Sequence, residues 1–187
     1  INNSYPGTKT DYSMPMAKIR GKYKKPVFSF EVGQYEVLPD FTEIEKFEGV
    51  LSPDNLEYVK ANVEKAGFAH KWEKWVQATG ELSRIAYREE VEACLRTEDM
   101  SGISLLGLQD FPGQGTALVG MINSHFETKP YEFAKSEKFR QFFASRVPLV
   151  KMDKYTYTTD EVFEFELLFA NYGKEDIGGI WRCELEG

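Results

Sequence analysis

The sequence predicts an α/β fold built around two short apolar strands that a long helical region connects. Val27–Phe30 is an apolar run that leads directly into Glu31, and Ile103–Leu108 is a second run that leads into Gln109 and Asp110. Strands that are buried on both faces of a parallel sheet have such continuous apolar runs. A helical crossover is the usual connection between parallel neighbours, so we expect the two strands to pair in parallel.

The region before and after the first strand is predicted to be mostly loop. Residues 1–13 form a polar stretch with Gly and Pro, and residues 14–25 have the pattern of a short basic surface helix. Residues 36–53 make a long acidic connection, and charge runs of this kind usually form a solvated face. We therefore expect the carboxylates of this connection to be exposed.

The crossover is predicted to contain three helices. Ser52 and Pro53 are a typical helix start, and Gly67 is a typical stop. A second helix is expected over residues 70–78 and a third over residues 81–96, each with an apolar stripe at helical spacing. Trp72 and Trp75 fall on one face of the second helix, where they serve a core more often than a sugar platform.

The remainder of the chain changes from helical to strand-like patterns. Residues 116–126 and 136–144 are predicted to be helices, whereas residues 147–150, 154–158 and 162–169 are rich in β-favouring residues. Turn residues then precede a further segment at residues 181–185. Several short strands after an α/β region predict the start of a β-sandwich of the immunoglobulin-like type, so we expect one domain over residues 1–146 and another over residues 147–187.

Composition excludes several classes of function. The chain has 187 residues with 42% apolar and 14% aromatic residues, and its net charge is −7. Nucleic-acid binding needs a basic surface, so it is not expected. No apolar run reaches 18 residues, so no membrane-spanning helix is expected. The two cysteines, Cys94 and Cys183, lack zinc spacing and are expected to be free and buried, and we expect neither a metal site nor a cofactor.

Polar side chains gather after both predicted strands. Ligands bind at the carboxyl ends of parallel strands because the loops there converge on a crevice or a barrel mouth. Glu31 is the candidate catalytic residue, although a strand end with a simply solvated carboxylate has the same pattern. The candidate substrate-binding residues are Gln34, Tyr35, Gln109, Asp110 and Gln114.

Two motifs carry a resemblance to a known family. FSFEVGQY at residues 28–35 and LLGLQDFPGQGTALVG at residues 105–120 resemble the last two barrel strands of β-galactosidase-like and β-glucuronidase-like members of glycoside hydrolase family two. The resemblance covers residues 10–170 approximately. It implies that the α/β region is the C-terminal portion of a (β/α)8 (TIM) barrel, that the partner is an oligo- or polysaccharide, and that the protein is periplasmic or secreted.

The resemblance also implies a mechanism. Retaining glycosidases use two carboxyl groups about 5–5.5 Å apart, one as the nucleophile and one as the acid/base. Glu31 stands at the family's nucleophile position. The family's acid/base follows an Asn at the end of the fourth barrel strand, and no matching segment occurs here, so we expect it to lie upstream of Ile1 and this chain alone to be inactive. One departure is that Gln109–Phe111 stands where better-known members have a tryptophan, which puts the sugar preference in doubt.

Two other classes of function remain open. A non-catalytic carbohydrate-binding module would use the same polar residues as hydrogen-bonding groups. A structural interaction domain would leave Glu31 and Asp110 pointing in unrelated directions. An excised part of a barrel is also expected to self-associate, because its uncovered strands present an apolar face or edge.

Overall fold

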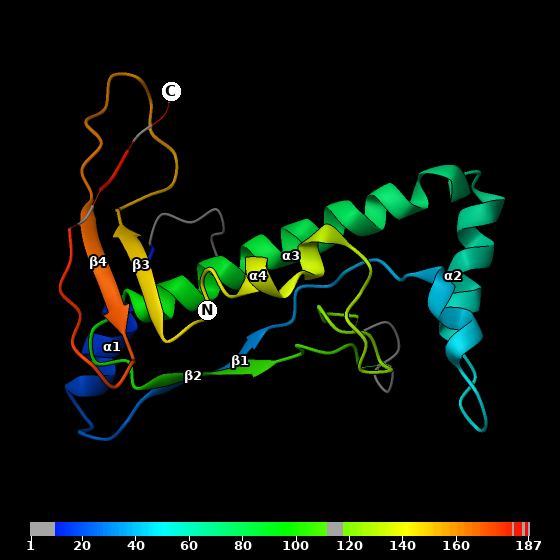
Figure 1. Ribbon diagram of the computed structural model, residues 1–187, viewed down its shortest axis with the longest axis horizontal. Helices are drawn as coiled ribbons and strands as arrows, with labels where there is room; N and C mark the ends of the chain where they lie inside the picture. Colours follow the sequence, from blue (N-terminus) through cyan, green and yellow to red (C-terminus); the bar gives the residue numbers. More distant parts are fainter. Residues whose placement is uncertain (1–9, 112–117, 181, 185, 187) are drawn as a thin grey trace.

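The computed structural model describes residues 10–111, 118–180, 182–184 and 186, and the helix α3 (Trp72–Leu95) runs along most of its length (Figure 1). A two-stranded parallel sheet lies along α3, and a two-stranded antiparallel sheet stands at the C-terminal end of the helix. The other elements are α1 (Ser13–Arg20), β1 (Phe28–Gly33), η1 (Phe41–Lys46), α2 (Asp54–Lys65), η2 (Ala69–Lys71), β2 (Gly102–Leu106), η4 (Glu132–Ala134), α4 (Ser136–Phe139), β3 (Arg146–Lys151) and β4 (Glu166–Asn171).

The parallel pairing of the two central strands is confirmed. Phe28 pairs with Gly102 at one end and Gly33 with Leu106 at the other, and the register shifts between Ser29 and Val32. One face of this sheet packs against α3, where Val32 joins the main apolar core. The core consists of Val32, Val37, Val76, Tyr87, Val91, Met121, Phe133, Ala134 and Phe142.

The other face of the same sheet is uncovered among the described residues. Phe28 and Phe30 alternate with Ser29 along β1, and their side chains are 59% and 76% exposed. Leu106 at the end of β2 is 43% exposed. Parallel sheets are normally covered on both faces, so the exposure of this face is unusual.

The crossover has one long helix where the sequence predicted two. Residues 70–78 and 81–96 were expected to be separate helices, but α3 continues through Gly80. A Cβ atom at this position would lie 2.1 Å from the ring of Phe133. Gly80 therefore permits close packing of η4 on the helix and does not end it.

Two predicted helices after β2 are corrected. Residues 118–126 contain no helix, because Ile122 makes bridges with Gln109 and Thr128 and the Asn123 side chain accepts the backbone N–H groups of His125 and Glu127. Asn favours such local turns over helices. The helix expected over residues 136–144 is reduced to α4, which ends at Phe139.

The C-terminal part contains fewer strands than the pattern suggested. β3 matches the predicted strand at residues 147–150, whereas β4 begins only at Glu166 and residues 154–158 are not a strand. β3 and β4 pair from Arg146 with Asn171 to Lys151 with Glu166. The barrel and the sandwich remain predictions, because two strands are common to many folds. None of the helices described has the length and apolar character needed to cross a bilayer.

Candidate functional site

Two side chains of α3 hold the carboxyl ends of β1 and β2. The Oε2 atom of Glu90 accepts hydrogen bonds from the Gly33 N–H and the Tyr35 hydroxyl, both at 3.0 Å. The Tyr87 hydroxyl lies 2.8 Å from the Gly107 carbonyl oxygen and 3.0 Å from that of Val119. Burial raises the pKa of Tyr87 to about 12, so its hydroxyl stays a donor at neutral pH.

Glycines make this close approach possible. Gly33 has a φ of 113°, and a Cβ atom there would lie 2.3 Å from the Tyr87 ring. Gly107 has a φ of 90°, and a Cβ atom there would lie 2.3 Å from Val119. Both strand ends therefore need residues without side chains.

Glu31, the candidate nucleophile, lies at the register shift of β1 in an unusual backbone conformation. Its φ is 57°, in the left-handed region that non-glycine residues seldom occupy. Its side chain is exposed, which agrees with the alternative of a solvated carboxylate at the strand end. The bulge turns the residue out of the alternation that buries Val32.

Neighbouring polar residues are placed in different ways. Gln34 also has a positive φ, 70°, and its side-chain amide donates to the backbone carbonyl of Glu31 at 3.4 Å. Tyr35 donates to Glu90, as described above. Gln109 is half-buried and pairs through its backbone with Ile122, and Gln114 lies outside the described residues. The structure thus places the Gln34 side chain in contact with the backbone of Glu31.

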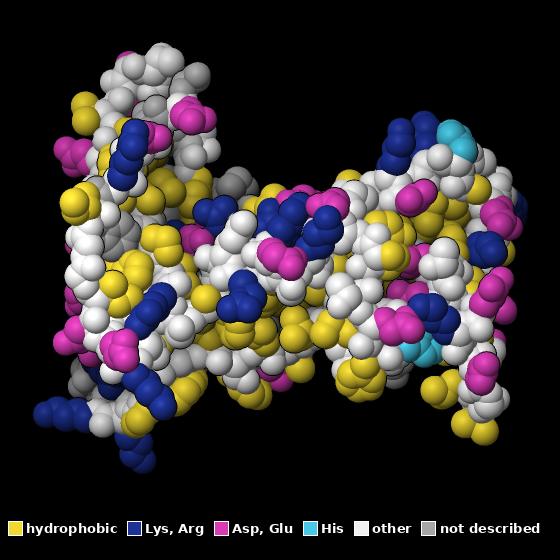
Figure 2. All heavy atoms as spheres, viewed as in Figure 1, with side chains coloured by type: hydrophobic (Ala, Val, Ile, Leu, Met, Phe, Trp, Pro, Cys, Tyr) yellow, Lys and Arg dark blue, Asp and Glu magenta, His cyan; other side chains and the backbone are white. Residues whose placement is uncertain are grey.

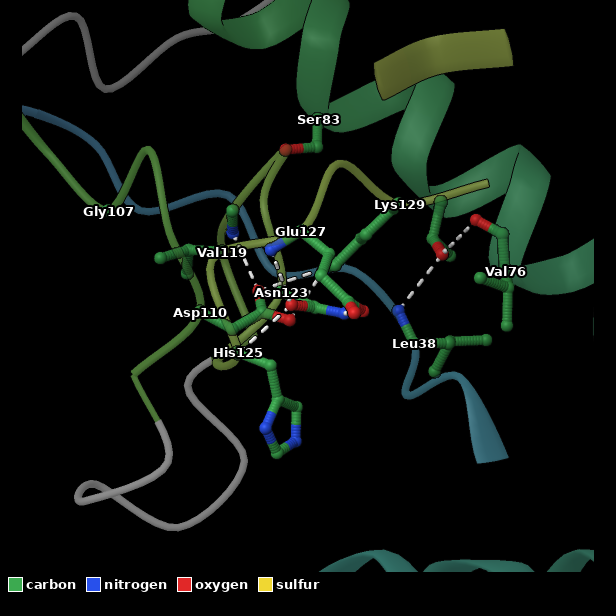
Figure 3. A network of polar contacts seen from close by, with 12 residues as sticks. Leu38, Val76, Ser83, Gly107, Asp110, Val119, Asn123, His125, Glu127 and Lys129 are labelled. Atoms are coloured by element: carbon green, nitrogen blue, oxygen red, sulfur yellow. Dashed lines mark hydrogen bonds and ion pairs between the residues drawn. The ribbon is translucent and has the colours of Figure 1, made fainter. Parts of the chain in front are cut away.

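Asp110 is engaged in a buried ion pair (Figure 3). It is 1% exposed, and its two carboxylate oxygens lie 2.9 Å from the Nζ atom of Lys129, which is 4% exposed. One of these oxygens also accepts the Gly120 N–H at 2.9 Å. Burial raises the pKa of Asp110 above its usual value, and Lys129 limits the rise. This arrangement favours a structural role for Asp110 over direct contact with a substrate.

A second carboxyl group near this pair was not expected from the sequence. Glu43 on η1 is 5% exposed, although the acids of residues 36–53 were predicted to be solvated. Asp40 is also buried, and it accepts the backbone N–H of Thr42 at the start of η1. An Asp followed three residues later by Glu is a helix-start pattern that could have identified both residues.

The surroundings of Glu43 favour its protonated form. Burial is the main cause, and the nearby Asp110 carboxylate adds to it, so the pKa of Glu43 rises to about 7. Lys129 and Lys46 oppose the rise. A carboxyl group of this kind can donate or accept a proton near neutral pH.

A tight loop, residues 123–127, lies next to η1. Asn123 donates its side-chain amide to Glu127, and Glu127 also forms an ion pair with Lys46 on η1. The ring of His125 lies 4.8 Å from that of Phe47, edge to face. Figure 3 shows the imidazole pointing away from the Asp110 and Lys129 pair. The loop therefore joins η1 to the segment after β2.

Comparisons add no family assignment. No protein-family model matches this chain, and no curated protein matches it. Within the described part of the chain, no group of three or more His, Cys, Asp or Glu side chains is arranged to hold a metal ion. Cys94 is free and buried as expected, whereas Cys183 is free but exposed.

Proposed function

We propose that this chain is part of a carbohydrate-active protein, a retaining β-glycosidase of the β-galactosidase-like kind, and that Glu31 is the nucleophile. The observation that carries the proposal is the exposed Glu31 carboxylate on a left-handed backbone at a bulge of β1. Strained non-glycine residues gather at functional sites, where the surrounding structure holds them. Glu90, Tyr87 and the two strand-end glycines supply that support here.

The proposal assigns separate roles to the neighbouring groups. Gln34, adjacent to Glu31, offers hydrogen bonds to sugar hydroxyls. Asp110 and Lys129 fix the segment that follows β2, so the role of Asp110 is to position this segment and not to contact the sugar. A retaining pair needs a second carboxyl group as the acid/base, and none of the groups named above is assigned to that role. This chain should therefore bind a neutral saccharide without hydrolysing it.

A titration of the chain with galactobiose, followed by amide NMR shifts, tests the binding part. We expect millimolar binding with shifts centred on residues 31–35. Gln34→Asn shortens the amide but tolerates the positive φ, and it should weaken binding at least fivefold. Glu36→Gln, an exposed change two residues further on, is the matched control and should leave the affinity unchanged. Equal effects of the two variants would remove Gln34 from the site.

The catalytic part needs a chain that extends upstream and includes the missing carboxyl group. In such a protein, Glu31→Gln should lower turnover more than 100-fold and leave sugar binding largely intact, because the amide keeps the shape and loses the attacking charge. Retention of more than about a hundredth of the turnover would contradict the nucleophile assignment.

A second candidate is a structural interaction domain. The uncovered β1–β2 face with Phe28, Phe30 and Leu106 favours it, because large exposed apolar patches mark association surfaces. Light scattering on the same samples separates the two: self-association at micromolar concentration without saccharide binding would favour the interaction domain.

A further inference from the structure

A pocket lies between the C-terminal half of α3 and the β3–β4 sheet, remote in sequence from the strand ends. Its volume is about 390 Å³, within the range of small-molecule sites. Figure 2 shows a hollow at this corner, with hydrophobic side chains on the β3–β4 side and charged side chains over α3. Its lining includes Arg88, Glu89, Glu92 and Arg96 on one side and Phe163 and Phe165 on the other.

The floor of the pocket is a fixed polar arrangement centred on Arg96. This arginine is 3% exposed, and it donates to the carbonyl oxygens of Thr10 at 2.9 Å and Val150 at 3.1 Å and to the Tyr155 hydroxyl at 3.2 Å. Its Nη1 atom also lies 3.4 Å from Glu92, which is 7% exposed. These contacts join α3 to β3, so the floor is held from several elements.

One oxygen of the floor has no hydrogen bond from any described residue. Glu89 Oε2 is buried and lies 3.6 Å from the Nη2 atom of Arg96, which is an ion-pair distance but not a hydrogen bond. Arg88 donates through Nε to Glu92 at 2.8 Å, and its side chain is 51% exposed. The Tyr155 hydroxyl also interacts with the Glu89 carboxylate, and a hydroxyl group of a ligand would supply the hydrogen bond that Oε2 lacks within the described part of the chain.

The opposite wall is aromatic. The rings of Phe163 and Phe165 are stacked with centroids 5.2 Å apart and planes inclined by 26°, and Tyr157 meets Phe163 edge to face at 4.9 Å. Phe163 is 38% exposed and Phe165 is 45% exposed. Both belong to the connection between β3 and β4, which projects beyond the strands in Figure 1. This wall offers flat apolar surface to a ligand.

The charged side chains that line the pocket limit the class of ligand that it can bind. The lining contains two arginines and three glutamates, and Arg96 is fully engaged in contacts within the protein. The pocket therefore has no surplus positive charge for a phosphate or a carboxylate. A neutral ring with an apolar face and hydroxyl groups at its rim matches an aromatic wall that faces an acceptor and an arginine.

We propose that this corner pocket binds one sugar ring of a neutral saccharide, as a subsite separate from the ends of β1 and β2. The ring packs on Phe163 and Phe165, and a hydroxyl group donates to Glu89 Oε2. The choice of a saccharide over other neutral ligands rests on the function proposed above, whereas the pocket and its polar floor do not.

Isothermal titration of the chain with galactobiose, and separately with adenosine, tests the inference. Phe163→Ala should weaken galactobiose binding at least fivefold, and Glu89→Gln should weaken it by a smaller factor. Tyr58→Ala on α2 is the matched control, because Tyr58 is an aromatic side chain with 73% exposure outside the pocket. Thermal melting of each variant verifies that it is folded.

The outcomes separate this subsite from the proposed strand-end site. Loss of binding in Phe163→Ala but not in Gln34→Asn would support the pocket and remove the strand-end site. The reverse pattern would overturn the pocket and leave the proposed function standing, and losses in both variants would support both. Adenosine binding that depends on Phe163, in the absence of galactobiose binding, would overturn the saccharide assignment.

Discussion

Two buried charge clusters, the Asp110–Lys129 pair after β2 and the Arg96 cluster at the C-terminal end of α3, differ in how completely their polar atoms are bonded. Asp110 has Lys129 within 2.9 Å of both carboxylate oxygens and also accepts the Gly120 N–H. In the corner pocket, Arg96 donates to Thr10, Glu92, Val150 and Tyr155, but Glu89 Oε2 accepts no hydrogen bond from the described residues. The carboxylate of the Asp110–Lys129 cluster is fully bonded within the protein, and this cluster stabilises the fold. The Arg96 cluster borders the pocket and leaves one acceptor without a hydrogen bond from the described residues. A ligand that donates to this acceptor would therefore add stability.

Breaking the closed cluster should have the largest effect on stability. Lys129→Met leaves the Asp110 carboxylate buried without its partner, which should lower the free energy of unfolding by about 3–5 kcal/mol. Urea denaturation measures this change. Lys46→Met removes the exposed Lys46–Glu127 ion pair and should cost much less, because solvent screens exposed charges. Similar decreases in the free energy of unfolding for the two variants would show that the buried Asp110–Lys129 pair stabilises the fold no more than an exposed ion pair does.

Gly33→Ala should have the next largest effect, because it disturbs the contact between β1 and α3. The new methyl group would meet the fully buried ring of Tyr87 and would also occupy a positive φ, which together should cost about 2–3 kcal/mol. Gly49→Ala separates the two causes, since Gly49 has a φ of 76° but no atom within 4 Å of the added Cβ. If Gly49→Ala costs as much, the backbone and not the Tyr87 contact sets the requirement.

Glu43 predicts an effect on stability that depends on pH. Its folded pKa, about 7, lies above the unfolded value of 4.5, so the folded protein retains a proton that the unfolded chain releases. The stability that Glu43 contributes is therefore fully present below pH 4.5 and is lost as the pH rises through 7. Relative to Glu43→Gln, the wild-type protein should lose up to about 1.4 kcal/mol per pH unit between these values.

Denaturation at pH 5, 6, 7 and 8 measures the Glu43 difference. Glu45→Gln is the control, because Glu45 is an exposed glutamate on the same 3-10 helix. A difference between wild type and Glu43→Gln that stays constant with pH would mean that the burial of Glu43 does not shift its titration.

Local sequence patterns correctly predicted those elements whose local structural preference agrees with their tertiary contacts. The apolar runs before Glu31 and Gln109 predicted two parallel strands, and Ser52–Pro53 predicted a helix that begins at Asp54. The same approach failed over residues 70–96, where two separate helices were expected but α3 is continuous. It also failed at residues 118–126, where apolar composition indicated a helix but Ile122 pairs with other segments.

The candidate site was predictable only in part. Glu31 and Gln34 follow from an apolar strand that ends in polar residues, and they do lie together. The raised pKa of Glu43 was not foreseen, because it depends on burial and on the charges of Asp110 and Lys129, which are far away in the chain. The corner pocket joins residues 88–96 to residues 148–184, and no local pattern connects such segments.

The sequence by itself determined the strand pair, the long helical crossover and the polar character of the strand ends, because these depend on the side-chain period and on neighbouring residues. The tertiary structure decided which carboxylates are buried, which glycines permit close packing and which of them end a helix, and where an acceptor is left without a donor. The reason is that burial and hydrogen-bond partners come from long-range contacts, as between Glu90 and Gly33 or between Arg96 and Val150. Such contacts exist only once the chain has folded.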